Sequence, residues 1–310
     1  SACSADGPSA AEGGGGQPGR SAGAGGTDFG NPSGLAGVSG ASLGGPAPAG
    51  SGSGEVCDGM DNDANGITDD VDAENDGVCD CLNIATIGQI GPWSDGGNVF
   101  KQWLDARSPR SAVELGDQVL SDELLRPFQV IVVLYAATFE FTGNGQRVPA
   151  HHAFSDAEVA AFRRWVEAGG GVMTTIGYTS DETREVENVN RLIAPLGVAY
   201  ATNNDAQLDG PIRSWADHPL ATGVRNITVM NGVAPLASGG VTVARDSANH
   251  PALQAAQAQA GHLVVWGDEW ITYDSQWVMV QDQQVERLWL NVLKWLSPAK
   301  VCQVPIKGPE

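Results

Sequence analysis

The apolar run at residues 129–135 places the strongest constraint on the fold of this chain. Its residues are rich in β-branched side chains and almost uniformly apolar, as expected for a strand that is buried on both faces. Residues 172–176 and 261–267 have a similar character, and helical patterns separate the three runs. Strands that alternate with helices are typical of a parallel sheet with crossover helices. We therefore expect an α/β domain.

Other sequence patterns predict further strands and helices of this domain. Residues 82–88 are expected to form its first strand, followed by a helical stripe of apolar residues at 99–104. Ser155 and Glu158 form a capping box that opens a helix, and the glycines at 169–171 stop it. Further helices are expected at residues 182–194 and 285–296. Trp289 and Trp295 in the closing helix are interpreted as core residues and not as a ligand platform.

The first 54 residues contain mainly Gly, Ala, Ser and Pro, with Phe29 as the only aromatic residue. Such a segment buries too little apolar surface to offset the entropy of ordering it. We expect residues 1–54 to be a disordered tether with an r.m.s. span of roughly 40 Å. The remaining ~255 residues suffice for one well-buried α/β core, which we place at residues 81–305, with a tail at 306–310.

Ser1, Ala2 and Cys3 match the end of a bacterial lipobox, where a lipoprotein signal peptide is cleaved. A lipid on Cys3 would anchor the protein without spanning the membrane, and the longest apolar run is too short for a transmembrane helix. We expect a lipid-anchored protein of the outer membrane or cell surface, with secretion as the alternative. A prosequence boundary is the other interpretation of these three residues.

Four cysteines remain when Cys3 is set aside, an even set that favours disulfides in an oxidising compartment. A bond between Cys79 and Cys81 rarely reaches allowed geometry. We prefer Cys57–Cys79 with Cys81–Cys302, and the alternative is Cys57–Cys81 with Cys79–Cys302. A zinc site is disfavoured because the surroundings are rich in Asp and lack a nearby His.

The formal net charge of −20 is unevenly distributed, because residues 55–80 contain ten acidic residues and no Lys or Arg. Nucleic acid and anionic membrane surfaces are therefore poor partners, whereas cations are good ones. Within this segment, residues 61–72 place oxygen ligands at positions 1, 3, 5, 9 and 12, with Gly66 at the sharp turn of a calcium loop. A second acidic half-loop follows at residues 72–77.

We predict a structural calcium site that stiffens this segment into a spacer. Its expected ligands, side-chain oxygens except for one main-chain carbonyl at Ile67, are Asp61, Asp63, Asn65, Ile67, Asp69, Asp72, Glu74 and Asp76. The alternative is an acidic, solvated linker. The pattern resembles thrombospondin type 3 and dockerin loops. Residues 57–63 resemble more closely the Cys-Asp-Gly-x-Asp-Asn-Asp metal-binding repeat of bacterial surface proteins, although residues 64–66 lack that repeat's second Cys-Asp-Gly.

Three short segments of the domain resemble motifs of a known protein superfamily. Residues 154–178 (FSDAEVAAFRRWVEAGGGVMTTIGY) are similar to the strand–helix–strand core of the class I glutamine amidotransferase-like fold, in its non-amidotransferase branches. Residues 217–224 (DHPLATGV) and 267–270 (GDEW) resemble motifs of ThuA-like proteins in that superfamily. The resemblance covers about residues 82–296. It implies a flavodoxin-like three-layer sandwich with a mostly parallel sheet, preceded by the tether and the calcium-type loop.

The family's catalytic cysteine is missing. Amidotransferases place this nucleophile at the turn after the strand that ends here at Ile176, but this sequence has Gly177 and Tyr178 there. Residues 267–269 also replace the His-x-Glu partner motif. We therefore exclude Cys-dependent amide hydrolysis and interpret Ser180 as a helix N-cap.

Ligands of open α/β sheets bind outside the carboxyl ends of the strands. The candidate site residues, taken from those ends and from neighbouring loops, are Trp93, Glu140, His152, Tyr178, His218, Asp268, Glu269 and Trp270. The plainer alternatives are that His152, beside His151, belongs to a solvated loop and that His218 shapes a turn. Asp268 and Glu269 could serve acid/base chemistry or accept hydrogen bonds from sugar hydroxyls, with a Trp stacked on the ring.

Three functional hypotheses follow. The first is a surface-displayed, non-catalytic binding module for a glycan or other polar extracellular ligand. The second is a sugar-directed hydrolase or isomerase that uses Asp268, Glu269 and a His, with or without a divalent metal. The third is a structural scaffold of an envelope assembly, which predicts a shallow crevice without converging polar groups.

Overall fold

The computed structural model describes residues 54–297, with gaps at residues 74, 89, 91–95, 135, 146, 177–181, 203–206 and 280–281. The expected tether with Cys3 and the tail with Cys302 lie outside the described residues. None of the helices within the described residues is long and apolar enough to cross a membrane.

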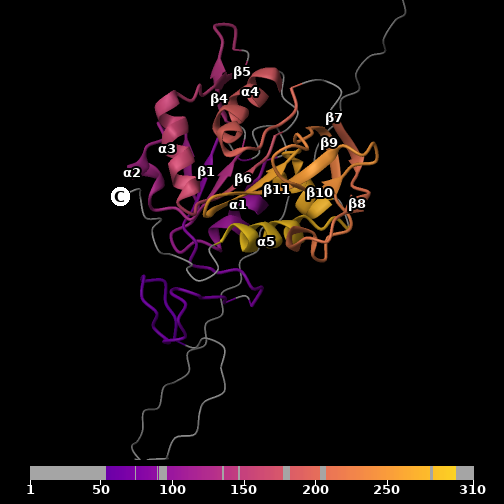
Figure 1. Cartoon of the computed structure of the whole chain (residues 1–310). Coiled ribbons are helices and arrows are strands. Elements are labelled where there is room, and N and C mark those ends of the chain that lie inside the picture. Colours follow the sequence, from indigo (N-terminus) through magenta and orange to yellow (C-terminus); the bar gives the residue numbers. More distant parts are fainter. Residues whose placement is uncertain are drawn as a thin grey trace, which may run out of the picture. The chain divides into compact units, whose positions relative to one another are not determined.

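A mixed sheet of eight strands forms the centre of the domain (Figure 1). The strand order is β2-β1-β3-β6-β12-β11-β10-β8. The parallel strands are β1 (Ile84–Ile87), β2 (Val113–Gly116), β3 (Val130–Val133), β6 (Gly171–Thr174) and β12 (Gly261–Trp266). In chain order they lie as 2-1-3-4-5, an order shared by flavodoxin-like sheets. The antiparallel extension consists of β11 (Pro251–Ala258), β10 (Val241–Arg245) and β8 (Ser214–Trp215). The predicted α/β class and mostly parallel sheet are confirmed.

Helices cover both faces of this sheet. Successive side chains of a strand point to opposite faces, so a central strand contributes residues to two core clusters. Val130 and Val132 of β3 belong to one core cluster, with α1 (Asn98–Asp105) and α5 (Val285–Leu296). Ile131 and Val133 belong to the other, which contains residues of α2 (Asp122–Leu125), α3 (Asp156–Glu167) and α4 (Glu182–Ile193). The prediction of a central strand buried on both faces is therefore confirmed.

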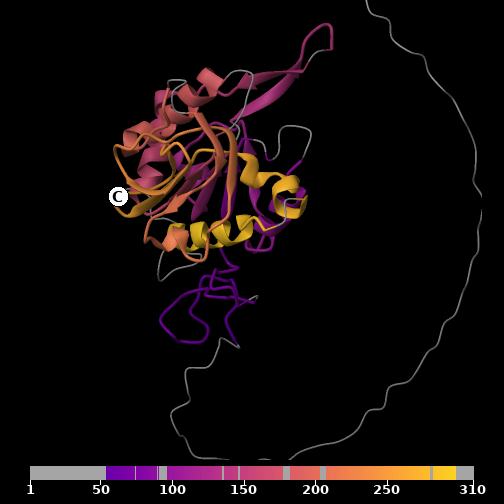
Figure 2. The same cartoon turned by 90° about the vertical axis from the view of Figure 1, so that its right-hand side faces the viewer.

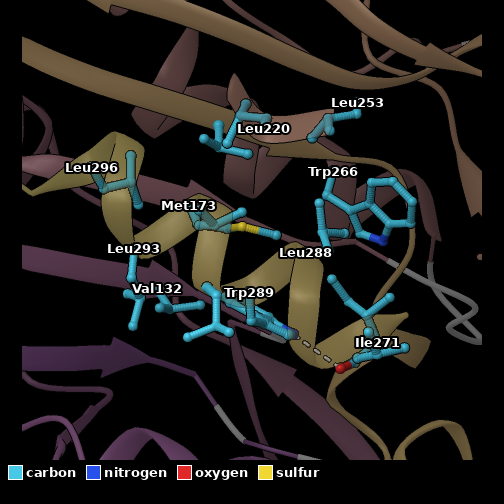
Figure 3. Close-up of a cluster of buried hydrophobic side chains, with 14 of the residues drawn as sticks. Val132, Met173, Leu220, Leu253, Trp266, Ile271, Leu288, Trp289, Leu293 and Leu296 are labelled. Atoms are coloured by element: carbon cyan, nitrogen blue, oxygen red, sulfur yellow. Dashed lines mark hydrogen bonds between the residues drawn. The ribbon is translucent and has the colours of Figure 1, made fainter. Parts of the chain in front are cut away.

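The closing helix α5 supplies much of the first cluster. Figure 3 shows Trp289 beside Leu288 and Leu293, with its indole Nε1 donating a hydrogen bond to the main-chain carbonyl of Ile271 at 3.1 Å. Trp289 is fully buried, so its interpretation as a core residue is confirmed. Gly171 permits the close approach of this helix to β6, since a Cβ there would lie 2.5 Å from the carbonyl oxygen of Leu296.

The predicted capping box opens α3. The Ser155 hydroxyl accepts a hydrogen bond from the Glu158 N–H, and the Glu158 carboxylate accepts one from the Ser155 N–H. The region before α3 is not a loop throughout, although the sequence allowed a solvated loop around His151 and His152. There β4 (Ala137–Phe141) and β5 (Arg147–His151) form a hairpin that stands out from the sheet in both views (Figures 1 and 2). A second small sheet pairs β7 (Gln207–Pro211) with β9 (Thr228–Val233).

The preferred disulfide pairing is wrong. Cys57 is bonded to Cys81, with the two Cα atoms 5.4 Å apart, because the acidic segment folds back on itself before β1. Cys81 is fully buried, and Cys57 packs against the same core cluster. Cys79 is also disulfide-bonded, and Cys302, its partner in the second arrangement, lies outside the described residues.

Candidate functional site

Asp268, directly beyond the carboxyl end of β12, is fully buried. Its Oδ2 accepts a hydrogen bond from the Met230 N–H of β9 at 2.7 Å, and its Oδ1 accepts one from the Trp270 N–H at 2.9 Å. Burial raises the pKa of Asp268 to about 7, although the two hydrogen bonds act in the opposite direction. The carboxyl group therefore joins β9 to the segment after β12.

Glu269 and Trp270 both contact Tyr273. Glu269 is 3% exposed, and its Oε1 accepts a hydrogen bond from the Tyr273 hydroxyl at 3.0 Å. The Trp270 ring stacks on the Tyr273 ring, with centroids 5.3 Å apart. Through these contacts Glu269 and Trp270, like Asp268, stabilise the turn after β12.

His218 lies at the other end of β12. Its Nδ1 accepts a hydrogen bond from the Leu220 N–H at 3.2 Å, and its ring packs on Trp295 with centroids 4.7 Å apart. Trp295 in turn stacks on His262, near the start of β12, whereas Asp268 follows the end of that strand. Burial lowers the pKa of His218. The structure thus gives His218 the turn-shaping role and separates it from the carboxyl edge.

Trp93 and Tyr178 lie outside the described residues, as does Ser180. Glu140 is placed only by its main chain, opposite Val148 in the β4–β5 hairpin.

His152 borders an open groove of about 620 Å³. One wall is the link between β5 and α3, formed by His152, Ala153 and Phe154. The other is a single face of α4, whose lining residues follow three- and four-residue helical spacing: Arg184, Glu187, Asn188 and Arg191. The chain reaches these walls after leaving β3 and β6, so the groove adjoins the carboxyl edge of the sheet. Its volume is in the range of ligand-binding sites.

The first wall is held in place by Glu158. The Nε2 atom of His152 lies 2.8 Å from Glu158 Oε1, and its ring meets Phe154 edge-on at 4.8 Å. Burial acts to raise the pKa of Glu158, but hydrogen bonds from the Ser155 N–H, His152 and the Leu120 N–H lower it to about 2. An ionised Glu158 therefore fixes the orientation of the His152 ring beside the groove.

A buried polar cluster lies next to the α4 wall and was missed by sequence reasoning. Tyr200 bonds to the Thr174 hydroxyl and to the Trp266 carbonyl, both at 2.8 Å. Burial, and secondarily the charge of Glu185, raises the pKa of Tyr200. Glu185 is 1% exposed. The burial of Glu185 could have been predicted from its position on the apolar stripe of α4, four residues before Val189.

The acidic segment contains two half-loops with the same hydrogen-bond pattern. Asp61 accepts from the N–H groups four and five residues ahead, and Asp72 does the same. Each half-loop has positive φ angles three and five residues after its Asp, at Ala64 and Gly66 and at Asn75 and Gly77. The second acidic half-loop is therefore a structural repeat of the first.

The predicted calcium ligands do not all converge. Carboxylate oxygens of Glu55, Asp61 and Asp63 lie within 4.8 Å of one another, and Glu55 was not among the predicted ligands. Asp69 is fully buried and accepts hydrogen bonds from the Asp58 and Gly59 N–H groups. Asp69, which the twelve-residue pattern places at position 9, thus closes the turn that follows Cys57.

Asp76 of the second half-loop is bound to the domain. Its Oδ2 lies 2.6 Å from Arg107 Nη2, and the Arg107 guanidinium covers the Trp103 ring at 4.0 Å. Val71 and Val78 pack against the core cluster of α1 and α5. The acidic segment is thus docked through its second half-loop and is not a free spacer. Glu74 lies outside the described residues.

Solved structures with similar folds share little sequence with this chain. The cytoplasmic protein STM1381 from Salmonella typhimurium LT2 has a TM-score of 0.52 and 14% identity, over 70% of this chain and 100% of its own. The mmIFT52 N-terminal domain has a TM-score of 0.50 and 15% identity, over 67% and 97%. A ThuA-like protein from Bacteroides uniformis ATCC 8492 has a TM-score of 0.42 and 12% identity, over 69% and 90%.

No family model and no curated protein matches the sequence. At identities this low, the first two structures show that the fold is an α/β fold of known type, and they carry no information about a ligand.

Proposed function

We propose that this protein is a non-catalytic binding module that holds a glycan or other polar extracellular ligand in the groove between His152 and α4. The observation that supports this most is the groove itself, which combines aromatic rings, an amide and charged side chains in one open space. Polar groups of this kind fix the orientation of a ligand, and apolar surface adds affinity.

The burial of the Asp268 and Glu269 carboxyl groups argues against sugar hydrolysis and favours a non-catalytic role. A glycosidase needs two carboxyl groups that reach opposite sides of one bond. The carboxyl groups of Asp268 and Glu269 instead bond to Met230, Trp270 and Tyr273. A purely structural scaffold is the remaining alternative, and it does not require the groove to accept a ligand.

A glycan array tests this function. We expect the protein to bind a subset of glycans. Asn188 is 8% exposed and its Nδ2 donates to the Ala136 carbonyl at 3.4 Å, so its Oδ1 is the atom left to accept a hydrogen bond from a ligand. Asn188→Ala should weaken binding about tenfold, since a lost hydrogen bond to a polar ligand costs about 1–1.5 kcal/mol. Asn190→Ala is unsuitable as a control because Asn190 bonds to Tyr200. Gln102→Ala, at an exposed position of α1, is the better match because it also removes an amide and keeps a helical backbone. An array without any reproducible binding would refute the proposal.

We further propose that the module is displayed at the bacterial cell envelope through a lipid on Cys3, with residues 4–54 as the tether. The lipobox-like triplet and the composition of the tether support this. Expressed in a bacterium from its full-length gene, the protein should enter the membrane fraction and take up labelled palmitate, and Cys3→Ser should abolish both. Labelling that survives this substitution would contradict it.

We also propose one structural calcium ion in the first half-loop. The residues fit such an ion, because Glu55, Asp61 and Asp63 offer hard oxygens at one place. The Asn65 Nδ2 group bridges the carboxylates of Asp63 and Asp70, at 3.1 and 2.9 Å. Asp70 Oδ1 is buried and accepts no hydrogen bond from the described residues.

The second half-loop differs because cationic side chains of the domain already neutralise it. Arg107 binds Asp76, and the Lys294 ammonium lies against Gly77. Calorimetric titration should therefore give one calcium per chain. Asp61→Asn should weaken binding at least tenfold, whereas Asp117→Asn, at an exposed position outside the segment, should not. A stoichiometry of two, or unchanged binding in Asp61→Asn, would show the assignment to be wrong.

A further inference from the structure

The charges of the groove differ from those of the chain as a whole. The chain has 17 Lys and Arg against 37 Asp and Glu. The groove is lined by two arginines, Arg184 and Arg191, and by one carboxylate, Glu187. Both arginines are exposed. An acidic protein that places two guanidinium groups on one wall of its groove offers a local site for negative charge.

Glu187 lines the groove between the two arginines, and two further carboxylates, Glu158 and Asp156, lie nearby. Glu158 is 4% exposed and is enclosed by hydrogen bonds from Leu120, Ser155 and His152. Asp156 contacts Arg191 only through Nη2, at 2.8 Å, and the Asp156 side chain is fully exposed. Exposed ion pairs of this kind contribute about 0–1 kcal/mol. A ligand carboxylate can displace such a partner, because a guanidinium has five donors and binds carboxylates in bidentate pairs.

The spacing of the two arginines along α4 indicates how extended the ligand is. Arg184 and Arg191 are seven residues apart on α4, which corresponds to ~10 Å along the helix axis. Two guanidinium groups spaced in this way along one helix suit an extended ligand with repeated negative charges. Asn188 lies between the two arginines on the same face, and His152 stands on the opposite wall. Their amide and imidazole groups are suited to hydroxyl groups between the charges.

From these observations we infer that the groove binds an acidic oligosaccharide, whose carboxylate or sulfate groups are bound by Arg184 and Arg191. The inference rests on the proposed function and specifies its ligand class. Arg184 and Arg191 would determine specificity for charge, whereas Asn188 and His152 would contact the sugar hydroxyls.

The test measures the affinity for three probes: hexagalacturonate, its methyl ester and a sulfated hexasaccharide. EDTA is present so that calcium cannot bridge the probe to the acidic segment. We expect at least one charged probe to bind, and the methyl ester to bind at least tenfold more weakly than hexagalacturonate if that is the probe bound. Arg184→Ala and Arg191→Ala should each weaken binding about tenfold. The affinity should also fall as salt increases, because charged pairs are screened.

Arg163→Ala is the matched control for Arg191→Ala. Arg163 is 51% exposed and pairs with Glu167 on α3, much as the 49% exposed Arg191 pairs with Asp156. Its loss should leave affinity unchanged. Thermal unfolding of each variant establishes that it is folded, and Arg191→Lys should restore only part of the affinity because Lys cannot form the bidentate pair.

The outcomes separate the two proposals. Binding of neutral glycans that depends on Asn188 and not on the arginines would overturn the acidic class and leave the proposed function standing. Binding of acidic probes that is indifferent to Asn188, Arg184 and Arg191 would overturn the groove as the site. Equal binding of poly-glutamate and the acidic sugars would overturn the sugar assignment, and failure of every charged probe would overturn the inference altogether.

Discussion

Asp268→Asn is expected to remove a large part of the pH dependence of stability between about pH 4 and pH 7. The pKa of Asp268 is raised from 3.8 to about 7 by burial. Between these values the folded protein keeps a proton that the unfolded chain has lost, so the stabilisation is complete below pH 4 and is lost as pH rises through 7. A shift of this size corresponds to about 4 kcal/mol.

Urea unfolding of both proteins from pH 4 to pH 8 measures this effect. The wild type should lose several kcal/mol of stability relative to Asp268→Asn across that range, so that its advantage at pH 4 is reversed at pH 8. At pH 4 the variant should be less stable by about 1–3 kcal/mol, since an Asn oxygen can satisfy only one of the Met230 and Trp270 N–H groups. Asp217→Asn, at an exposed position, serves as the control. Parallel curves for the wild type and Asp268→Asn would mean that Asp268 is ionised throughout.

Arg107→Met should destabilise the protein by about 3–5 kcal/mol, because it leaves a largely buried carboxylate unpaired. Arg107 and Asp76 have side-chain exposures of 7% and 17%, and Arg107 Nη1 also donates to the Trp103 carbonyl at 3.0 Å. The loss should release the second half-loop from α1, while the Cys57–Cys81 bond keeps the segment tethered to β1.

Unfolding of a double mutant separates the ion pair from the packing of Arg107. Arg107→Met combined with Asp76→Asn should be more stable than Arg107→Met alone, because no buried charge remains. The matched surface change, Arg163→Met, should cost less than about 0.5 kcal/mol. Equal losses in Arg107→Met and Arg163→Met would show that Asp76 is solvated and that the acidic segment is not docked.

The sequence predicts most of the parallel part of the fold because most of its elements carry a strong local signal, whereas the short, largely exposed strand β2 (VELG) carries none and was not predicted. The continuous apolar runs at β3, β6 and β12 and the capping box of α3 are such signals. The antiparallel extension lacks them. β11 has the sequence PALQAAQA, whose Ala and Gln residues have low strand propensity, so this strand is stabilised by its pairing with β10 and β12 and not by local preference.

The site was harder to predict because residue type does not reveal which way a side chain faces. Asp268 and Glu269 follow a strand end, as predicted, yet both are buried because β9 and Tyr273 cover them. His152 was identified, but the arginines opposite it were not. They follow a helical spacing on α4 that is also typical of a solvated face. Only the packing of the β5–α3 link beside α4 gives these residues a common groove.

Hydrogen exchange of the protein, with and without the oligosaccharide that binds best, tests the central claim most directly. If the groove holds the ligand, slower exchange is expected in peptides that cover residues 152–154 and α4, and unchanged exchange in peptides that cover residues 268–273. Protection confined to residues 268–273, with α4 unaffected, would place the ligand at the turn after β12 and contradict the groove as the binding site.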